Sequence, residues 1–149
     1  MMIETEVLYA HIKTEDWLKP AAENLLREIS QGKHGKVLVS KEFLHELYYV
    51  SKEEGTSLDE YIQRAAALTS IPNLVFQPTT VEIDLLALTV MRQYGLTSLF
   101  DAYHAATCLN ADPDNHLYLT DQIYDKIPGI TRTDPRDFTT KVVKNINSE

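Results

Sequence analysis

Short runs of β-forming residues alternate along this chain with longer stretches of helical periodicity. Such alternation is typical of βα units, in which helices cover the faces of a mainly parallel sheet. The sequence therefore predicts an α/β fold with a central, mainly parallel sheet flanked by helices. The predicted strands are Met1 to Glu4, Lys36 to Val39, Leu74 to Phe76 and Leu117 to Leu119.

Amphipathic periodicity and capping residues predict the helices between these strands. Apolar residues recur at helical spacing from Leu18 to Ile29, which predicts an amphipathic helix. Side-chain oxygens that can accept hydrogen bonds from free backbone N–H groups mark the starts of four later helices. These predicted starts are Ser40, Ser57, Thr79 and Ser98. The helix after Thr79 is expected to end at Gly95.

The residue pattern after Leu119 predicts a turn followed by a short helix. The segment after Leu119 is rich in polar residues and contains a Pro-Gly pair at 128–129, which is typical of a turn. Asp134 followed by Pro135 suits a helix cap with proline at the first helical position. A C-terminal helix with Phe138 and Val142 is therefore expected to close the fold.

Chain length and composition favour one folded domain over residues 1–149. The chain has 149 residues, of which 44% are hydrophobic and 24% charged, as in an ordinary folded domain with a single core. Apolar runs stay shorter than the roughly 18 residues that a membrane span needs. Cys108 is the only cysteine, and no basic leader precedes an apolar stretch near the N-terminus. We therefore expect a cytoplasmic protein without membrane contact.

The formal net charge of −8 limits the kinds of nucleic-acid protein that the chain could be. Proteins that coat nucleic acids neutralise phosphates with clustered Lys and Arg, so the charge argues against that class. A nuclease stays compatible with the charge, because acidic side chains can face bound metal ions.

Four acidic side chains stand at strand ends or early in helices that follow strands. Glu4 and Asp121 follow predicted strands, and ligands of parallel sheets bind outside the carboxyl ends of the strands. Glu46 and Asp101 lie near the starts of helices. The spacing of these four residues in the sequence does not by itself show that their side chains meet in the folded protein. Each also has an ordinary explanation, as a strand-edge acid, a solvated helix residue, a capping-box acid or a turn residue.

Four segments, in this order, resemble the motifs of the PIN domain family. Ile3–Leu8 resembles the family's opening, in which an acid, a hydroxyl residue and usually Asn follow the first strand. Ser40–Leu47 resembles the second motif, with Ser at the helix start and the acid six positions later. Leu96–Thr107 and Leu119–Gln122 resemble the third and fourth motifs. Together the four segments span nearly the whole chain.

The resemblance implies a metal-dependent ribonuclease that hydrolyses RNA phosphodiester bonds. In this family such an enzyme is most often the toxin of a VapC-type toxin–antitoxin pair, usually a homodimer that a small antitoxin inhibits. Mg²⁺ or Mn²⁺ is the expected cofactor, because hard cations prefer carboxylate and water oxygens. Such an ion activates water and stabilises charge as phosphorus is attacked.

The resemblance also assigns residues to the site. The implied catalytic residues are Glu4, Glu46, Asp101 and Asp121. Of these, the implied metal ligands are Glu4, Asp101 and Asp121. The residues expected to support them are Thr5 and Thr120, through their hydroxyls, and Asp125, as a further acid.

Two residues depart from the family's first motif. Glu4 stands where the family usually has Asp, and Glu6 stands where it usually has Asn. The altered motif keeps a second hypothesis open, in which a PIN fold with weakened or lost catalysis binds protein or RNA.

Other sites receive less support from the sequence. His104 and Cys108 are four residues apart, a spacing that two zinc ligands can share, but zinc usually needs more ligands. We expect His104 instead to pack near the acidic site or to join a hydrogen-bond network. Asp112 and Asp114 resemble the start of a calcium loop, yet Leu117 stands where that loop requires Gly. Glycine-rich phosphate loops and a Gly-x-Ser-x-Gly elbow are absent from the sequence.

Overall fold

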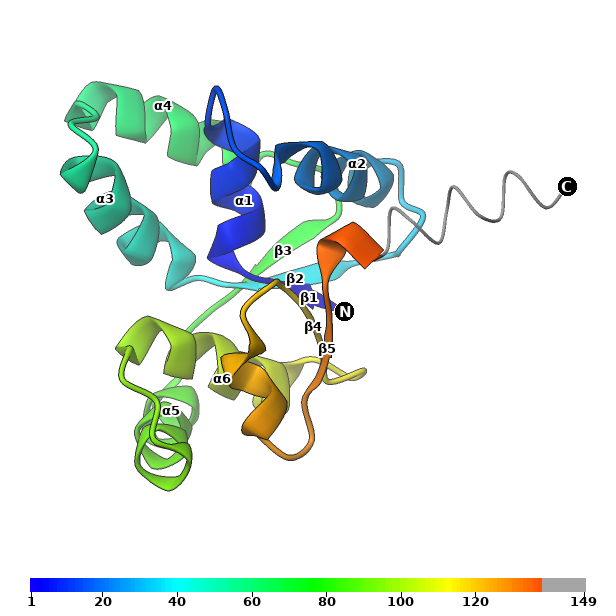
Figure 1. The fold of residues 1–149 in the computed structure, drawn as a ribbon, viewed down its shortest axis with the longest axis vertical. Coiled ribbons are helices and arrows are strands. Elements are labelled where there is room, and N and C mark those ends of the chain that lie inside the picture. The colour runs from blue at the N-terminus through cyan, green and yellow to red at the C-terminus, as the bar shows by residue number, and fades with distance from the viewer. Residues whose placement is uncertain (138–149) are drawn as a thin grey trace, which may run out of the picture.

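Five parallel strands form one sheet in the computed structural model, which describes residues 1–137 (Figure 1). The strands are β1 (Met2–Ile3), β2 (Val37–Ser40), β3 (Leu74–Gln77), β4 (His116–Tyr118) and β5 (Thr131–Thr133). Their order across the sheet is β3-β2-β1-β4-β5, and every neighbouring pair is parallel. The predicted α/β class with a parallel central sheet is confirmed.

Helices connect the strands and cover both faces of the sheet. They are α1 (Thr5–Ile12), α2 (Lys19–Ser30), α3 (Phe43–Glu53), α4 (Leu58–Thr69), α5 (Val81–Tyr94), α6 (Leu99–Ala111) and the 3-10 helix η1 (Gln122–Lys126). Figure 1 shows α1 to α4 on one side of the sheet and α5 and α6 on the other. Within residues 1–137, no helix combines the length and apolar character needed to cross a bilayer.

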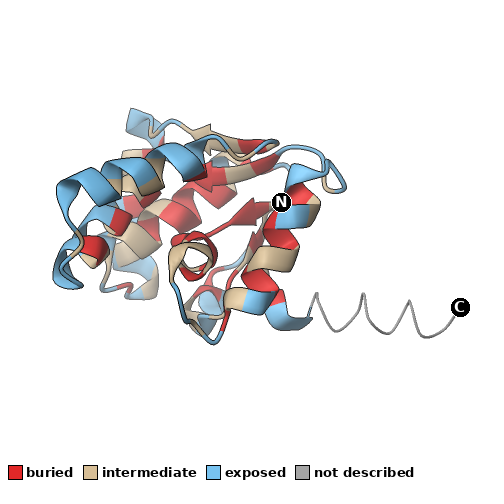
Figure 2. Cartoon of the chain, turned by 90° about the horizontal axis from the view of Figure 1, so that it is seen from above, coloured by how far each residue is buried: buried red, intermediate tan, exposed pale blue. Residues whose placement is uncertain are grey.

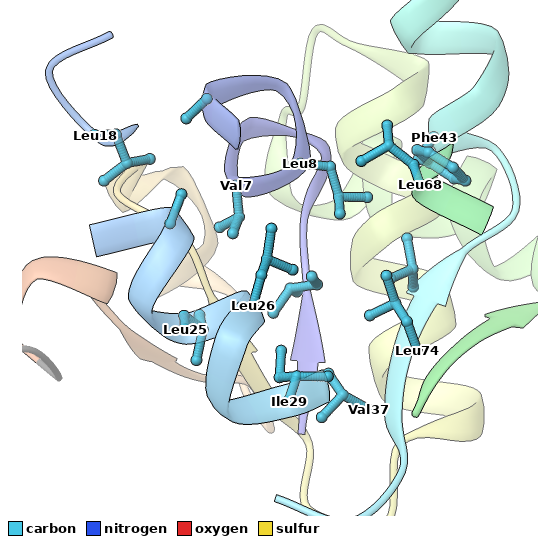
Figure 3. Close-up of a cluster of buried hydrophobic side chains, with 14 of the residues drawn as sticks. Val7, Leu8, Leu18, Leu25, Leu26, Ile29, Val37, Phe43, Leu68 and Leu74 are labelled. Atoms are coloured by element: carbon cyan, nitrogen blue, oxygen red, sulfur yellow. The ribbon is translucent and has the colours of Figure 1, made fainter. Parts of the chain in front are cut away.

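Two clusters of buried apolar side chains hold these layers together. Successive side chains of a strand point to opposite faces, so Met2 joins the cluster under α5 and α6 while Ile3 joins the cluster under α1 and α2. Figure 3 shows the second cluster, where Ile29 of α2 lies beside Val37 of β2. Full burial of each such side chain contributes about 1.5–3 kcal/mol. Figure 2 shows the result, with buried residues concentrated in the sheet and on the inner sides of the helices.

The first strand is shorter than predicted, and the chain turns into α1 at Glu4. Strand β1 ends at Ile3, and the Glu4 side chain caps α1 by accepting a hydrogen bond from the Glu6 N–H at 2.9 Å. Glu4 is buried, so its interpretation as a strand-edge surface acid is wrong. The sequence prediction contained no helix between this strand and Leu18. Burial of Val7 and Leu8 in the core stabilises α1 there.

Strand β5 is absent from the sequence prediction. Its three residues, Thr131–Thr133, pair in parallel with β4 at the edge of the sheet. None of the three is apolar, because this edge strand buries no core side chain and therefore lacks the hydrophobic signal of the inner strands.

The predicted helix starts agree with the structure at α4 and α6 but not at α3 and α5. Ser57 and Ser98 cap α4 and α6, each accepting a hydrogen bond from the backbone N–H three residues later. Helix α5 is capped by Thr80, so the predicted cap at Thr79 is wrong by one residue. The Thr79 hydroxyl instead donates to Glu42 at 2.8 Å. Either threonine could cap a helix, but the Thr79 hydroxyl is hydrogen-bonded to Glu42, and Thr80 caps α5.

The other predicted helix boundaries fall as follows. The predicted start at Ser40 is wrong by two residues, because Ser40 ends β2 and Glu42 is the N-cap of α3. The Ser40 hydroxyl accepts a hydrogen bond from the Glu42 N–H at 3.2 Å, in the turn before the helix. Gly95 ends α5 in the left-handed conformation, with a φ of 66°, which glycine adopts without steric cost. Asp134 accepts a backbone N–H at 2.9 Å and so caps the turn that begins at residue 135. The predicted C-terminal helix with Phe138 and Val142 lies outside the described residues.

Candidate active site

The candidate site lies where the order of the strands reverses. The chain passes from β1 outward to β2 and β3, and then returns to add β4 and β5 on the other side of β1. Crevices outside the carboxyl ends of the strands at such a switch are where open parallel sheets bind ligands. Glu4 directly follows β1, and Asp121 comes three residues after the end of β4.

Glu4, Glu46 and His104 form a polar cluster at this edge, in which Glu4 and His104 are buried and Glu46 is half-buried. The Nε2 atom of His104 lies 3.1 Å from Glu46 Oε1 and 3.4 Å from Glu4 Oε1. The Thr5 hydroxyl lies 3.2 Å from the same nitrogen. One oxygen of each carboxylate and one ring nitrogen all lie within 4.8 Å of one another. Side chains from the starts of α1 and α3 and from the middle of α6 therefore meet at one point.

Asp101 lies one helical turn before His104 on α6. It is half-buried, and the hydroxyl of the buried Tyr124 donates to Asp101 Oδ1 at 3.3 Å. Burial raises the pKa of Asp101, and the negative charges of Glu46 and Asp121 raise it further. The charges of two other predicted site acids, Glu46 and Asp121, therefore act on Asp101.

Asp121 and Thr120 lie on the loop after β4, and Glu6 holds that loop. Asp121 is exposed, and its side chain caps η1 by accepting the Ile123 N–H at 3.0 Å. The Thr120 N–H donates to Glu6 Oε2 at 3.0 Å, and the Thr120 hydroxyl donates to Glu6 Oε1. Glu6, the second departure from the family's first motif, therefore ties the loop that carries Asp121 to α1.

Asp125 is engaged away from the buried cluster. Its carboxylate forms an ion pair with Arg132 of β5, with N–O distances of 2.8 and 3.0 Å. Arg132 also donates to the Leu119 carbonyl at 3.3 Å. The structure thus gives Asp125 a role in joining η1 to the edge strand, and we leave it out of the proposed metal ligands.

The charges of the buried cluster depend on one another. Burial raises the pKa of Glu4 to about 7, against the lowering effect of the His104 charge. Burial alone would raise the pKa of Glu46, but the hydrogen bond and charge of His104 lower it. Burial would lower the pKa of His104, yet its hydrogen bond to Glu46 and the charge of Glu4 raise it. In its protonated form, His104 therefore balances part of the negative charge of the two carboxylates.

Sequence reasoning placed His104 near the site, and the structure places it at the centre. Its position three residues after Asp101 puts both on adjacent turns of one helix, which is the signal that the sequence carried. Cys108 is buried in the apolar cluster beneath α5. Among residues 1–137, the one group of three or more His, Cys, Asp and Glu side chains able to hold a metal contains His104 without Cys108. The spacing of these two residues therefore does not mark a zinc site.

A family model described as the PIN domain matches residues 1–113. The chain belongs to the PIN domain family. The matched range includes Glu4, Glu46 and Asp101 and ends before Asp121. A search among curated proteins gave no significant match.

Solved structures share the fold of this PIN domain. One is a toxin-antitoxin complex from Klebsiella pneumoniae, at a TM-score of 0.64 and 16% identity, covering 90% of this chain and 96% of that chain. Another is VapBC2 from Rickettsia felis bound to a DNA fragment from its promoter, at a TM-score of 0.65 and 16% identity, covering 90% and 98%. At this identity the likeness establishes the fold alone.

The buried donors of this PIN domain fit a divalent metal ion. Carboxylates withdrawn from water are costly unless a cation compensates them, and the buried Glu4 and the half-buried Glu46 both lie beside His104 Nε2. Carboxylate oxygens suit Mg²⁺ and Mn²⁺, and imidazole nitrogen suits several transition ions. The cluster therefore offers both the charge and the donor atoms that such an ion requires.

Removing the Glu6 carboxylate should loosen the loop that carries Asp121. Hydrogen bonds to charged groups contribute about 1.5–3 kcal/mol each, so we expect Glu6→Ala to lower the free energy of unfolding by about 2 kcal/mol. The amide resonances of Thr120 and Asp121 should shift in heteronuclear NMR spectra. Glu15→Ala, in an exposed loop, is the control and should change neither quantity. Unchanged Thr120 and Asp121 resonances in Glu6→Ala would show that Glu6 does not hold the loop.

Proposed function

We propose that this PIN domain is a metal-dependent endoribonuclease that hydrolyses phosphodiester bonds of RNA. The observation that carries the proposal is the meeting of Glu4 and Glu46 in a buried cluster, with Asp101 one turn away on α6. Membership in a family of nucleases supports a hydrolase. A buried acidic cluster at the carboxyl edge of a parallel sheet is the kind of site that such chemistry uses.

In this proposal Glu4, Asp101 and Asp121 hold Mg²⁺ or Mn²⁺, and Glu46 is the fourth catalytic acid. When bound, the ion supplies Lewis-acid stabilisation of the charge that develops on the phosphoryl oxygens. The chain's own groups fix the ligands. Tyr124 holds one oxygen of Asp101, the Glu6 N–H holds one oxygen of Glu4, and Thr120 fixes the loop beside Asp121.

RNA cleavage by the full chain tests the proposal directly. We expect a mixed pool of labelled RNAs to be cut in the presence of Mg²⁺ or Mn²⁺ and to stay intact in excess chelator, with activity returning when the ion is added back. The control is Glu4→Gln combined with Glu46→Gln, which removes both carboxylate charges of the cluster. Cleavage that continues in chelator, or in the double variant, would contradict the proposed site.

A catalytically weakened PIN module that binds protein or RNA is the second candidate. The observation that favours it is the contact of His104 with the carboxylates of Glu4 and Glu46, which already compensates part of the charge that a metal ion would balance. Glu4 also uses one oxygen to cap α1. For this candidate we expect RNA or protein binding without RNA cleavage at millimolar Mn²⁺ in the same assay.

We further propose that the protein works as a homodimer in the cytoplasm and pairs with a small antitoxin. Exposed apolar side chains support a protein partner: Val81, Leu85 and Leu88 share one face of α5 and are each more than half exposed.

The proposed cytoplasmic location is supported by the free cysteine, Cys108, because a buried unpaired thiol fits a reducing compartment.

Light scattering tests the self-association. Twofold pairs are the commonest oligomers, and an exposed apolar face is costly in water, so we expect twice the mass of the 149-residue chain at micromolar concentration. Leu85→Glu, which places a charge in the middle of the α5 face, should shift the population toward single chains. A single-chain mass for the unmodified protein across this range would remove the homodimer from the proposal.

A further inference from the structure

We propose that His104 is itself a metal ligand, so that the cluster of Glu4, Glu46 and His104 binds first-row transition ions in preference to Mg²⁺. The proposal rests on the site of the proposed function, keeps Glu4 as a ligand, and adds the Glu46 carboxylate and a nitrogen donor to the ligand set. That donor sets the class of ion that the site prefers.

The geometry around His104 Nε2 is that of neighbouring ligands on one ion. Two ligand atoms each about 2.1 Å from a shared ion are about 3.0 Å apart at a right angle and about 3.4 Å apart at a tetrahedral angle. His104 Nε2 lies 3.1 Å from Glu46 Oε1 and 3.4 Å from Glu4 Oε1. All three donor atoms lie within 4.8 Å of one another, so a small adjustment of side chains would let one ion contact them all.

The surroundings of His104 direct Nε2 into the cluster. The side chain is fully buried in the middle of α6, with buried neighbours Ala105 and Ala106. Its Nδ1 atom has no hydrogen-bond partner among the described residues, whereas Nε2 contacts both carboxylates and the Thr5 hydroxyl. The one ring nitrogen with polar contacts is thus the one that faces the acids. To become a ligand, Nε2 would release its proton, and the ion would take the place of that proton beside the two carboxylates.

A nitrogen donor changes the order of metal affinities. Mg²⁺ prefers oxygen ligands and octahedral geometry, and it keeps several waters. Imidazole suits Zn²⁺ and Ni²⁺, and affinities of nitrogen-containing sites rise from Mn²⁺ to Ni²⁺. A site with two carboxylates and one buried imidazole should therefore bind Ni²⁺ or Zn²⁺ more tightly than Mn²⁺, and Mn²⁺ more tightly than Mg²⁺.

Calorimetric titration of the full chain with Mg²⁺, Mn²⁺ and Ni²⁺ gives the first test. We expect His104→Gln, which offers an amide oxygen in place of the nitrogen, to lower the ratio of Ni²⁺ to Mg²⁺ affinity at least tenfold. His45→Gln is the matched control, because His45 lies on α3 next to Glu46 in the sequence but its side chain is 65% exposed. The control should leave the ratio unchanged. An unchanged ratio in His104→Gln would overturn the proposal.

Histidine ¹⁵N NMR of the unmodified protein gives a second test, which does not depend on whether the variant folds. Addition of Zn²⁺ should move the Nε2 resonance of His104 to the position of a metal-bound nitrogen. Zn²⁺ binding that leaves this resonance in place, or no binding of Zn²⁺, would overturn the proposal.

The outcomes separate this inference from the proposed function. A metal-bound His104 in a protein that never cuts RNA would remove the ribonuclease and support the ligand. Chelator-sensitive RNA cleavage with a His104 resonance that no ion moves would support the ribonuclease and overturn the ligand.

Discussion

Asp101→Asn is expected to reduce metal-dependent RNA cleavage by about 100-fold or more while the fold is retained. The substitution removes a charged metal ligand but keeps an oxygen that Tyr124 can bind. A metal ion supplies several kcal/mol of charge stabilisation, and about 1.4 kcal/mol corresponds to a tenfold change in rate. Initial rates of cleavage of a labelled RNA at saturating Mn²⁺ measure the effect.

The same variant should be at least as stable as the unmodified protein when metal is removed. Burial, followed by the charge of Glu46, raises the pKa of Asp101. A carboxyl group whose folded pKa lies above its unfolded value weakens the folded state once it ionises. The neutral amide of the variant carries no such charge, so its unfolding temperature in chelator should equal or exceed that of the unmodified protein.

Asp59→Asn is the control for both measurements, since Asp59 is an exposed residue in the first turn of α4. It should keep full cleavage activity and its metal-dependent increase in unfolding temperature. If Asp101→Asn were as active as this control, Asp101 would lie outside the catalytic site.

The second large effect is a loss of stability on raising the pH of the metal-free protein. The pKa of Glu4 rises from 4.5 to about 7 on folding, primarily through burial. The folded state therefore binds the proton more tightly, and its stability declines as pH rises between these two values. Because a tenfold change in proton affinity corresponds to about 1.4 kcal/mol, the expected decline is about 3 kcal/mol.

The other two groups of the cluster fit this pH profile. The pKa of His104 is raised above 6.5, so its stabilising contribution is lost as pH rises through the folded value, in the same direction as for Glu4. The pKa of Glu46 is lowered from 4.5, so its contribution is lost only as pH falls below that value. Metal-free stability should thus decrease from about pH 5 toward pH 8.

Denaturant unfolding in chelator at half-unit steps from pH 5 to 8 measures this decline. Glu4→Gln should flatten most of it, and Glu15→Gln, in an exposed loop, should leave it unchanged. A divalent ion competes with protons for the same oxygens, so added Mn²⁺ should stabilise the protein more at pH 8 than at pH 6. Metal-free stability that is constant or rises with pH would show that Glu4 is ionised at no cost.

Local sequence signals specified most of the secondary structure. Ser57 and Ser98 mark helix starts because each side chain caps the backbone of its own helix, an interaction that spans only three residues. Gly95 ends α5 for a similarly local reason. The inner strands carry enough apolar residues to be recognised, and the acids after β1 and β4 could be assigned to the carboxyl edge of the sheet.

Local sequence signals failed to predict those elements that are stabilised by contacts between residues far apart in the chain. Helix α1 (Thr5–Ile12) was not predicted, and it is stabilised by Val7 and Leu8, which pack in the core formed with α2 and the sheet. The edge strand β5 exists because β4 lies beside it. Thr80 became the α5 cap while Thr79 contacts Glu42, which is 37 positions away.

The sequence by itself determined the α/β architecture and placed acidic residues at the carboxyl ends of strands, because capping, periodicity and chain direction are local properties. Only the tertiary structure decided that His104 contacts Glu46, 58 positions away, and that the Thr5 hydroxyl lies beside the same ring, 99 positions away. It also decided the proton affinities, since the pKa of Glu4 depends on its burial and on the charges of His104 and Glu46. Those charges and that burial arise only when the strand order brings α1, α3 and α6 together.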